Sequence, residues 1–175
     1  MKKLSTTELK RVSVDDFKST RKIPLVVVLD NLRSMHNVGA AFRTGDAFAI
    51  EKIFLCGITA KPPHRDIQKT ALGATDSVAW EYTESTVDAL KQLKEEGYQI
   101  CVIEQTDESI TLDEFVFKQD GKYAVVFGNE AFGVEDSVLP YADVALEIPQ
   151  YGTKHSLNVS VCLGVVLWEA VKVLR

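Results

Sequence analysis

The stretch that decides the fold is Ile148-Pro149-Gln150-Tyr151-Gly152-Thr153-Lys154-His155-Ser156-Leu157-Asn158-Val159-Ser160. The apolar run 144–148 predicts a buried strand, which Pro149 ends because proline has no N–H to donate to a ladder. Ser156 and Asn158 are residue types that cap helices, and an apolar helix is expected over 159–174. A strand thus leads through a polar loop to a helix N-terminus, where free N–H groups can hold a ligand. On shape alone, an ordinary strand–loop–helix connection is the simpler explanation.

Composition places the chain among ordinary globular domains. Its 175 residues, 46% of them hydrophobic, are enough to bury the core of one domain. Cys56, Cys101 and Cys162 lie far apart in apolar runs, which argues against disulfides or a zinc site and favours a reducing, cytoplasmic compartment. No signal peptide is expected, and Glu169 and Lys172 in the most apolar helix argue against a membrane span.

The net charge is unevenly distributed. Its total of −5 argues against nucleic-acid binding, but residues 1–22 carry seven basic and three acidic side chains, a net charge of +4. Because exposed charges are screened within roughly 8–10 Å, a local basic face can still bind phosphate. The N-terminus is therefore either a phosphate-binding segment or a solvated, frayed end.

Alternating strands and helices predict an α/β fold with a mainly parallel sheet flanked by helices. Fully apolar strands are typical of a sheet that is covered on both faces. The small residues of the second helix would let its backbone lie close to a neighbour. The expected strands are 25–29, 53–56, 78–82, 99–104, 123–127 and 144–148. The expected helices are one from Ser13, 37–49 capped by Asn37, 66–72, 85–96, 134–139 and 159–174.

The last helix is apolar nearly all round, with Val161, Val165 and Trp168 outside any single stripe. A helix at the end of a small domain cannot easily bury every face within its own chain. A homodimer interface is therefore expected, and a helix sandwiched in the core is the alternative.

Several common ligand-binding patterns are missing from the sequence. It contains no G-x-G-x-x-G after the first strand, no G-x-x-x-x-G-K-[ST] and no G-x-S-x-G. His36, His64 and His155 lack metal-ligand spacing, so no metal site is expected. Dinucleotide sites, phosphate-binding loops and serine hydrolase chemistry are disfavoured.

Three polar loops, at 105–109, 128–133 and 149–158, each follow an apolar strand. The carboxyl ends of parallel strands meet at one edge, so we expect these loops to form a ligand site there. Glycines let a ring approach the backbone, which suits a flat base and its ribose. Arg43 is unusual in an apolar helix segment: it is either a functional cation or half of a structural salt bridge, for instance with Glu130.

Three motifs occur in order along the chain. They are Asn37-x-Gly39-Ala40-x-x-Arg43-Thr44, Gly128-Asn129-Glu130-x-x-Gly133 and Ile148-Pro149-x-x-Gly152-x-x-x-Ser156-Leu157-Asn158-Val159-Ser160. In order and spacing they resemble the motifs of SpoU-type (TrmH-like) RNA 2′-O-ribose methyltransferases of the SPOUT superfamily. The resemblance covers about residues 24–174.

The resemblance implies a SPOUT fold with a deep C-terminal trefoil knot, S-adenosyl-L-methionine as cofactor, and a homodimer with the site across its interface. Carried over position by position, the implied catalytic residues are Arg43, Asn37, Glu130, Ser156 and Asn158. The implied cofactor-binding residues are Thr106, Gly128, Asn129, Ile148, Gly152, Ser156 and Leu157, of which Thr106 is anchored by no motif.

Arginine stays protonated in proteins, so Arg43 is expected to pair with an RNA phosphate and stabilise charge at O2′ rather than act as a base. If a general base is needed, Glu130 is one candidate by residue type, and a phosphate oxygen of the substrate is another. Positioning of the reactants, worth roughly 7–11 kcal/mol, is expected to supply much of the acceleration.

We expect a short basic extension over 1–23 and a catalytic domain over 24–175. Some members of the family carry further RNA-binding segments, so RNA contact is expected from the basic N-terminus, from the loop 61–65 with Lys69, and from the dimer groove. A tRNA substrate is preferred over rRNA, because a minimal domain suits a compact RNA. Two alternatives stay open: a cofactor- and RNA-binding module without catalysis, and a SPOUT enzyme that methylates a base.

Overall fold

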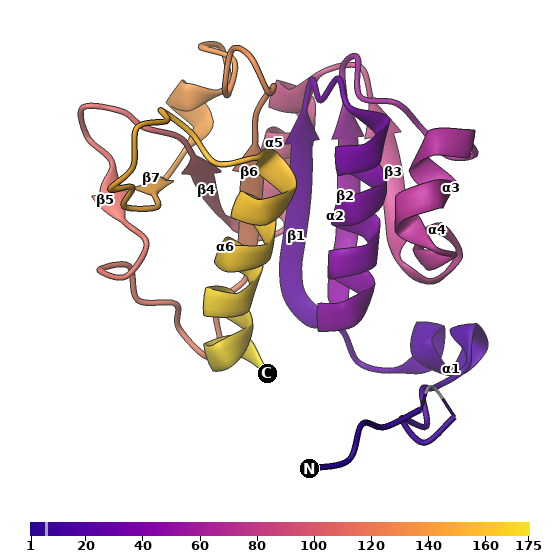
Figure 1. The fold of residues 1–175 in the computed structure, drawn as a ribbon. Helices are drawn as coiled ribbons and strands as arrows, with labels where there is room; N and C mark the ends of the chain where they lie inside the picture. The colour runs from indigo at the N-terminus through magenta and orange to yellow at the C-terminus, as the bar shows by residue number, and fades with distance from the viewer. Residues whose placement is uncertain (6) are drawn as a thin grey trace.

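In a computed structural model, which describes residues 1–5 and 7–175, the chain builds one seven-stranded sheet in the order β3-β2-β1-β6-β4-β7-β5. All strand pairs of the described residues are parallel, so the strands end at one common edge, at the top in Figure 1. The strands are β1 (Ile23–Asp30), β2 (Ile50–Cys56), β3 (Ala79–Thr83), β4 (Gln99–Ile103), β5 (Ile110–Thr111), β6 (Tyr123–Phe127) and β7 (Val144–Glu147). Thr6, within the predicted N-terminal extension, lies outside the described residues.

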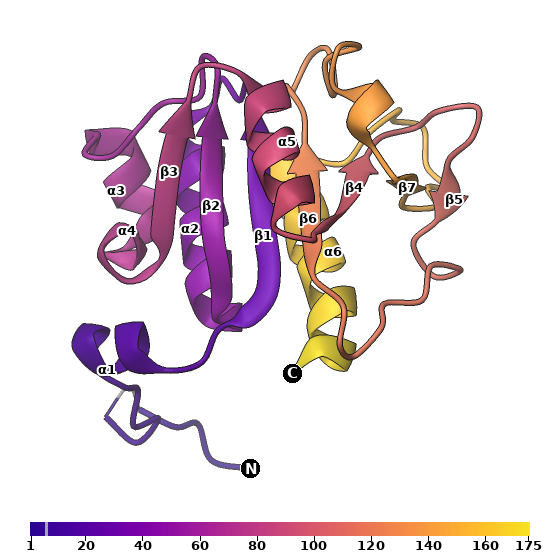
Figure 2. The same cartoon turned by 180° about the vertical axis from the view of Figure 1, so that it is seen from behind.

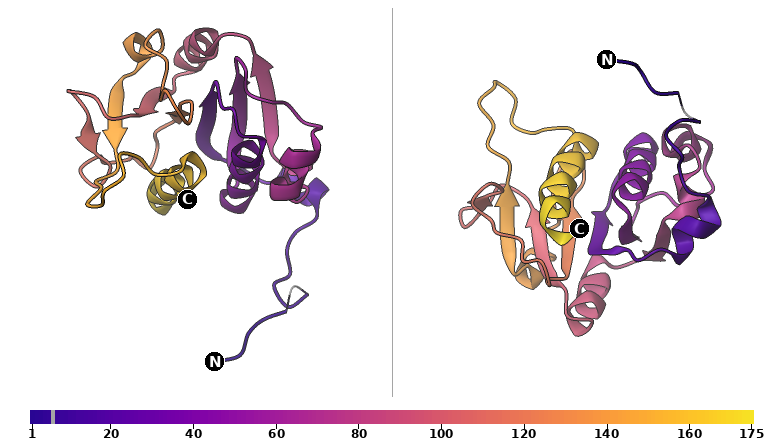
Figure 3. Two further views of the ribbon diagram at one scale, coloured as in Figure 1. Left: turned by 45° about the horizontal axis from the view of Figure 1, so that its top comes forward. Right: turned by 90° about the horizontal axis from the view of Figure 1, so that it is seen from below.

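Helices cover both faces of the sheet. The helices are α1 (Val14–Ser19), α2 (Met35–Phe48), α3 (Arg65–Ala71), α4 (Ala74–Ser77), α5 (Thr86–Glu95), the 3-10 turn η1 (Leu139–Tyr141) and α6 (Val159–Leu174). The helices α2 and α6 lie side by side on one face, and α5 lies on the other, as Figures 1 and 2 and the view from below in Figure 3 agree. The predicted α/β class with a parallel sheet flanked by helices is confirmed.

The sequence of β1 explains the three layers. Successive side chains of a strand point to opposite faces. Leu25, Val27 and Leu29 enter the core under α2 and α6, while Val26 and Val28 enter the core under α5. All five side chains are fully buried, which is why the run shows no alternation of apolar and polar residues.

The start of α2 differs from the expectation. We expected Asn37 to cap this helix, but the cap is Ser34, whose hydroxyl accepts a hydrogen bond from the Asn37 N–H at 3.3 Å. The amide side chain of Asn37 is therefore free to bond elsewhere. The predicted close approach of this helix is confirmed at Gly39, where an added Cβ would lie 2.1 Å from Thr70 Oγ1 of α3.

The helix predicted over 134–139 is wrong. The Val134 and Glu135 N–H groups donate to the side chains of Glu104 and Asp30, at 2.9 Å each, which holds this segment in a turn. Only the short η1 follows, and it contains Pro140.

One long side of α6 is exposed within a single chain. Its inner residues, among them Leu163, Val166 and Leu167, are buried against the sheet. Val161 and Trp168 on the outer side are each 54% exposed. Trp168 packs against Phe48 of α2 with ring centroids 6.0 Å apart, so the apolar outer face continues onto the neighbouring helix.

The predicted trefoil knot remains a prediction. Among the described residues, no helix is both long and apolar enough to span a membrane.

Candidate active site at the carboxyl edge of the sheet

A pocket of about 480 Å³ opens at the carboxyl ends of β4, β6 and β7, against the start of α6. This is the edge at which open parallel sheets bind ligands. All three predicted loops contribute to it. Its apolar wall consists of Ile103, Phe127, Leu146, Ile148, Leu157 and Val159.

Glu130 lies at this pocket and is held by hydrogen bonds on both carboxylate oxygens. The backbone N–H of Arg33 donates to Oε2 at 2.9 Å, and the N–H of Ser34 donates to Oε1 at 3.0 Å. The Asn37 side-chain amide donates to Oε1 at 2.9 Å. Partial burial alone would raise the pKa of Glu130, but these donors outweigh it and lower the pKa below its ordinary value. Glu130 is therefore a bound carboxylate at neutral pH.

Asn37 and Asn158 connect this carboxylate to the last helix. Asn158 Nδ2 donates to Asn37 Oδ1 at 3.3 Å. Asn158 Oδ1 accepts from the Ser160 N–H at 2.9 Å and so caps α6, as the sequence predicted. One residue from each of the three motifs therefore stands in a single hydrogen-bonded chain, Glu130–Asn37–Asn158, beside the pocket.

The second motif forms a closed turn. The backbones of Asn129 and Gly133 bond to each other in both directions at 2.8 Å. An added Cβ on Gly128 would lie 2.1 Å from the carbonyl carbon of Gly133, so the turn requires glycine there. Asn129 also donates its side-chain amide to the Asn31 carbonyl at 2.7 Å, which ties the turn to the loop before α2.

The third wall of the pocket is built by residues without a motif. Glu104 and Gln105 follow β4, and both line the pocket. Glu104 accepts from the Val134 N–H and from the Gln105 N–H, at 2.9 Å each. Gln105 donates its side-chain amide to the His155 carbonyl at 3.0 Å. The residue carried over for this wall, Thr106, does not line the pocket.

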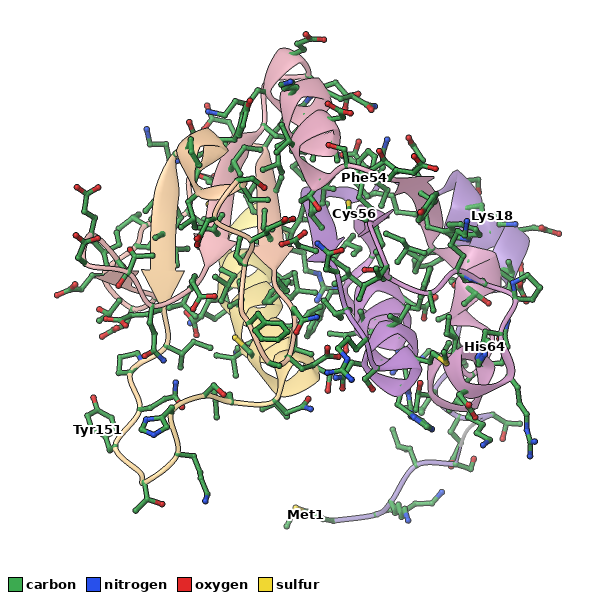
Figure 4. The ribbon with its side chains drawn as sticks, turned by 90° about the horizontal axis from the view of Figure 1, so that it is seen from above. Met1, Lys18, Phe54, Cys56, His64 and Tyr151 are labelled. Carbon is green, nitrogen blue, oxygen red and sulfur yellow. The ribbon has the colours of Figure 1, made fainter. Side chains whose placement is uncertain are left out.

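The loop after β7 contributes only part of its length. Ile148, Ser156, Leu157 and Asn158 line the pocket, but the predicted cofactor residue Gly152 does not. The middle of the loop projects away from the sheet, and Tyr151 on it is 95% exposed (Figure 4).

Arg43 lies apart from this pocket. Its side chain is exposed on α2, and it does not line the pocket of its own chain. Among the described residues no ion pair involves Arg43, so the alternative of a structural salt bridge with Glu130 is not formed. Arg43 is a cation that its own chain leaves available.

The exposed basic side chains Lys61, Arg65 and Lys69 lie on α3 and in the loop before it. Lys69 is paired with Asp66 at 2.8 Å, and this bond lowers the pKa of Asp66, with smaller contributions from the nearby His36 and His64. Figure 4 shows His64 on the opposite side of the molecule from Tyr151. Lys61 lies 3.8 Å from the centre of the Tyr82 ring.

The described residues contain no cluster of three or more side chains that could hold a metal ion.

The pocket itself is acidic. Glu104, Glu130 and Glu147 line it, and its lining residues, all of which the structure describes, include no lysine, arginine or histidine. An apolar wall, exposed backbone groups and carboxylates suit a ligand that combines a flat base with a positively charged group.

Two relatives resemble the chain along most of its length. The 23S rRNA (guanosine-2′-O-)-methyltransferase RlmB of Vibrio parahaemolyticus is 31% identical over 94% of this chain and 66% of the relative. The tRNA (guanosine(18)-2′-O)-methyltransferase of Thermus thermophilus is 30% identical over 94% of this chain and 82% of the relative. The chain thus spans just under two thirds of the Vibrio enzyme.

A solved structure and a family model agree with these relatives. The AdoMet-bound rRNA methyltransferase from Sinorhizobium meliloti superposes with a TM-score of 0.81 at 25% identity, over 89% of this chain and 58% of the other. The model of the SpoU rRNA Methylase family matches residues 24–168. The chain belongs to this family.

Proposed function

We propose that this protein transfers a methyl group from S-adenosyl-L-methionine to a ribose 2′-hydroxyl of RNA. The observation that carries the proposal is the hydrogen-bonded series Glu130–Asn37–Asn158, which joins the three motifs beside the pocket. Its donor–acceptor distances are 2.9 and 3.3 Å. Both named relatives methylate a guanosine 2′-O position, one in rRNA and one in tRNA.

The pocket fits the cofactor of the Sinorhizobium enzyme, whose structure is AdoMet-bound. Its apolar wall suits an adenine ring, and its carboxylates suit the positively charged sulfonium group. Gly128, Ile148 and Leu157 would hold the cofactor, whereas Thr106 and Gly152 are expected to act only through neighbouring residues. When bound, the cofactor supplies an electrophilic methyl group.

Arg43 is proposed to bind the RNA phosphate next to the reacting ribose. Its guanidinium stays charged and presents several N–H donors in one plane, which matches phosphate oxygens. It would also stabilise the negative charge that develops on O2′ as the hydroxyl proton leaves.

Glu130 is proposed to hold the neighbouring residues of the site in place rather than to remove the proton of the ribose 2′-hydroxyl. Three donors already bind its carboxylate, and its lowered pKa makes it a weaker base than an ordinary glutamate. The hydroxyl proton would then pass to another acceptor, for which a phosphate oxygen of the substrate is the candidate. Ser156 and Asn158 would orient the ribose from the other rim.

A homodimer is proposed to complete the site. The exposed apolar side of α6 and the adjoining Phe48 form a face that a second copy can cover. Arg43 does not line the pocket of its own chain, and association would let it reach the pocket of the second copy.

We further propose that residues 24–175 form the catalytic domain and that the extension 1–23 binds RNA. The basic charge of the extension and the surface around Lys61, Arg65 and Lys69 support phosphate contacts. Of the two RNA classes we propose tRNA, because the chain matches 82% of the Thermus tRNA enzyme and 66% of the Vibrio rRNA enzyme. The free thiols of Cys56, Cys101 and Cys162 suit the cytoplasm.

The test is transfer of labelled methyl groups to total tRNA and, separately, to rRNA, both from cells that lack this protein. Arg43→Ala is compared with Arg175→Ala, which removes an exposed arginine at the end of α6. We expect label in tRNA as a 2′-O-methyl nucleoside. Transfer should fall by at least about 100-fold in Arg43→Ala and stay at the wild-type rate in Arg175→Ala.

Each other outcome has a definite meaning. Label on a base would overturn ribose methylation in favour of base methylation. Cofactor binding without transfer to either RNA would favour a binding module. Label in rRNA alone would keep the chemistry and overturn the choice of substrate.

A further inference from the structure

In the part of the chain that the structure describes, no ion pair involves the acidic residues that line the pocket. Glu104 accepts its two hydrogen bonds from the backbone N–H groups of Val134 and Gln105, which carry no net charge. Neither Glu104 nor Glu147 takes part in an ion pair among the described residues. Both carboxylates therefore line the pocket without an ion-pair partner among the described residues.

The position of Glu104 is firmly set. Gly133 has a positive φ of 73°, and a Cβ added there would lie 2.1 Å from Glu104 Oε2, so the turn of the second motif packs directly on this carboxylate. Glu147 comes from a different element, the end of β7. Because β7 pairs with β4 and Leu146 lies opposite Ile103, the two carboxylates reach the pocket from the ends of neighbouring strands.

The thiol of Cys162, on α6, lies near Glu104. Its pKa is raised to about 11, mainly by burial and in part by the negative charge of Glu104. Cys162 also lines the pocket, so the thiol and the Glu104 carboxylate border the same space.

We infer that Glu104 and Glu147 make this pocket select its ligand by charge, so that it binds the cationic methyl donor more tightly than the neutral demethylated product. The inference rests on the proposed function. Methyl transfer breaks a sulfur–carbon bond, forms an oxygen–carbon bond and releases the hydroxyl proton, while the electron pair of the broken bond stays on sulfur. The positive charge on sulfur is thereby lost, and with it the attraction to the acidic walls, which favours release of S-adenosylhomocysteine.

The inference is tested by calorimetric titration with S-adenosylmethionine, S-adenosylhomocysteine and sinefungin, an analogue in which a carbon that bears a charged amine replaces the methylated sulfur. Glu147→Gln is the main variant, because its side chain accepts no hydrogen bond among the described residues. Glu104→Gln is the second variant. Glu108→Gln is the control, because it removes a charge from the same loop without lining the pocket.

In Glu147→Gln we expect the affinity for S-adenosylmethionine and sinefungin to fall roughly three- to tenfold, and that for S-adenosylhomocysteine to change by less than about twofold. The difference should shrink at high salt, because partly exposed charges are screened. Glu104→Gln should show the same preference, with an added loss for all three ligands since its amide cannot accept both backbone bonds. Glu108→Gln should bind all three like the wild type.

Equal losses for all three ligands in Glu147→Gln would overturn the inference and leave these carboxylates a structural role. Unchanged affinities for all three ligands would overturn it as well. So would the same preference in Glu108→Gln, because such a preference would reflect only the overall charge of the protein. If the wild type bound none of the three ligands, the proposed function would fail together with the inference.

Discussion

Glu130 is the side chain whose role depends most on its surroundings. A free carboxylate at this position would be an acceptable base. Bound by Arg33 N–H, Ser34 N–H and Asn37 at 2.9 to 3.0 Å, it instead orders the loop that precedes α2. The same contacts that keep it ionised make it reluctant to accept a proton.

Glu130→Gln should therefore reduce methyl transfer by only about tenfold, because a glutamine oxygen can still accept part of these bonds. The pH dependence of the rate should keep its wild-type shape. A loss of roughly 10²–10⁴ together with a vanished acidic limb, measured in single-turnover rates across pH, would identify Glu130 as the base.

The lowered pKa of Glu130 also predicts that the free energy of unfolding depends on pH. Its pKa is lowered in the folded state, so its contribution, roughly 1 kcal/mol after allowance for exposure, is present above its unfolded pKa. This contribution is lost as the pH falls through the lowered folded value. Urea unfolding of wild type and Glu130→Gln should differ by a constant amount at neutral pH and converge in acid. A difference that grew in acid would contradict the assignment.

At the scale of elements, Asn158 has two separable tasks. Its Oδ1 caps α6, and its Nδ2 donates to Asn37. Asn158→Ala should lower the free energy of unfolding by about 1 kcal/mol and also impair methyl transfer. Asn158→Asp should keep the cap but lose the donor, so stability should hold while transfer falls.

Ser85→Ala is the matched control, because Ser85 caps α5 on the opposite face of the sheet. It should lose a similar free energy of unfolding with unchanged methyl transfer. If Ser85→Ala impaired transfer as much as Asn158→Ala, helix stability alone would explain both effects.

The elements that carry long apolar runs could be predicted from the sequence. The strands β1, β4 and β6 and the helix α6 were found at nearly their observed bounds. The false helix over 134–139 arose because its first N–H groups donate to Asp30 and Glu104, residues that no local pattern connects to it. The short β5 and α4 were missed, since elements of two and four residues show no periodicity.

The site was predicted in the same uneven way. Gly128, Glu130, Ile148, Ser156, Leu157 and Asn158 were assigned through their motifs, and the pocket contains them all. The sequence assigns no role to Glu104 and includes Gln105 only as part of the loop 105–109, because only the folded chain brings the end of β4 against the turn of the second motif. The Asn37 cap was misjudged because Ser34 lies one turn earlier with an equally suitable hydroxyl.

At the scale of the molecule, the outer side of α6 predicts association. Light scattering should give a mass near twice the 19.4 kDa of the chain. Trp168→Glu should shift it to that of a single chain and reduce methyl transfer, because a charge would then lie in the buried interface. Val116→Glu, at an apolar side chain that is 77% exposed elsewhere, should leave the mass unchanged. A wild type of single-chain mass with full transfer would contradict the proposed dimer.

The hydrogen bonds of the Glu130–Asn37–Asn158 chain join residues 93 and 121 positions apart in sequence. Closing such long loops costs entropy before any contact stabilises them, so contacts of this kind form late during folding. Local helices and adjacent strand pairs such as β1 and β2 can form first. We therefore expect the pocket to be assembled late in folding, so the gain of ligand binding after dilution from denaturant should report a late step rather than the first collapse of the chain.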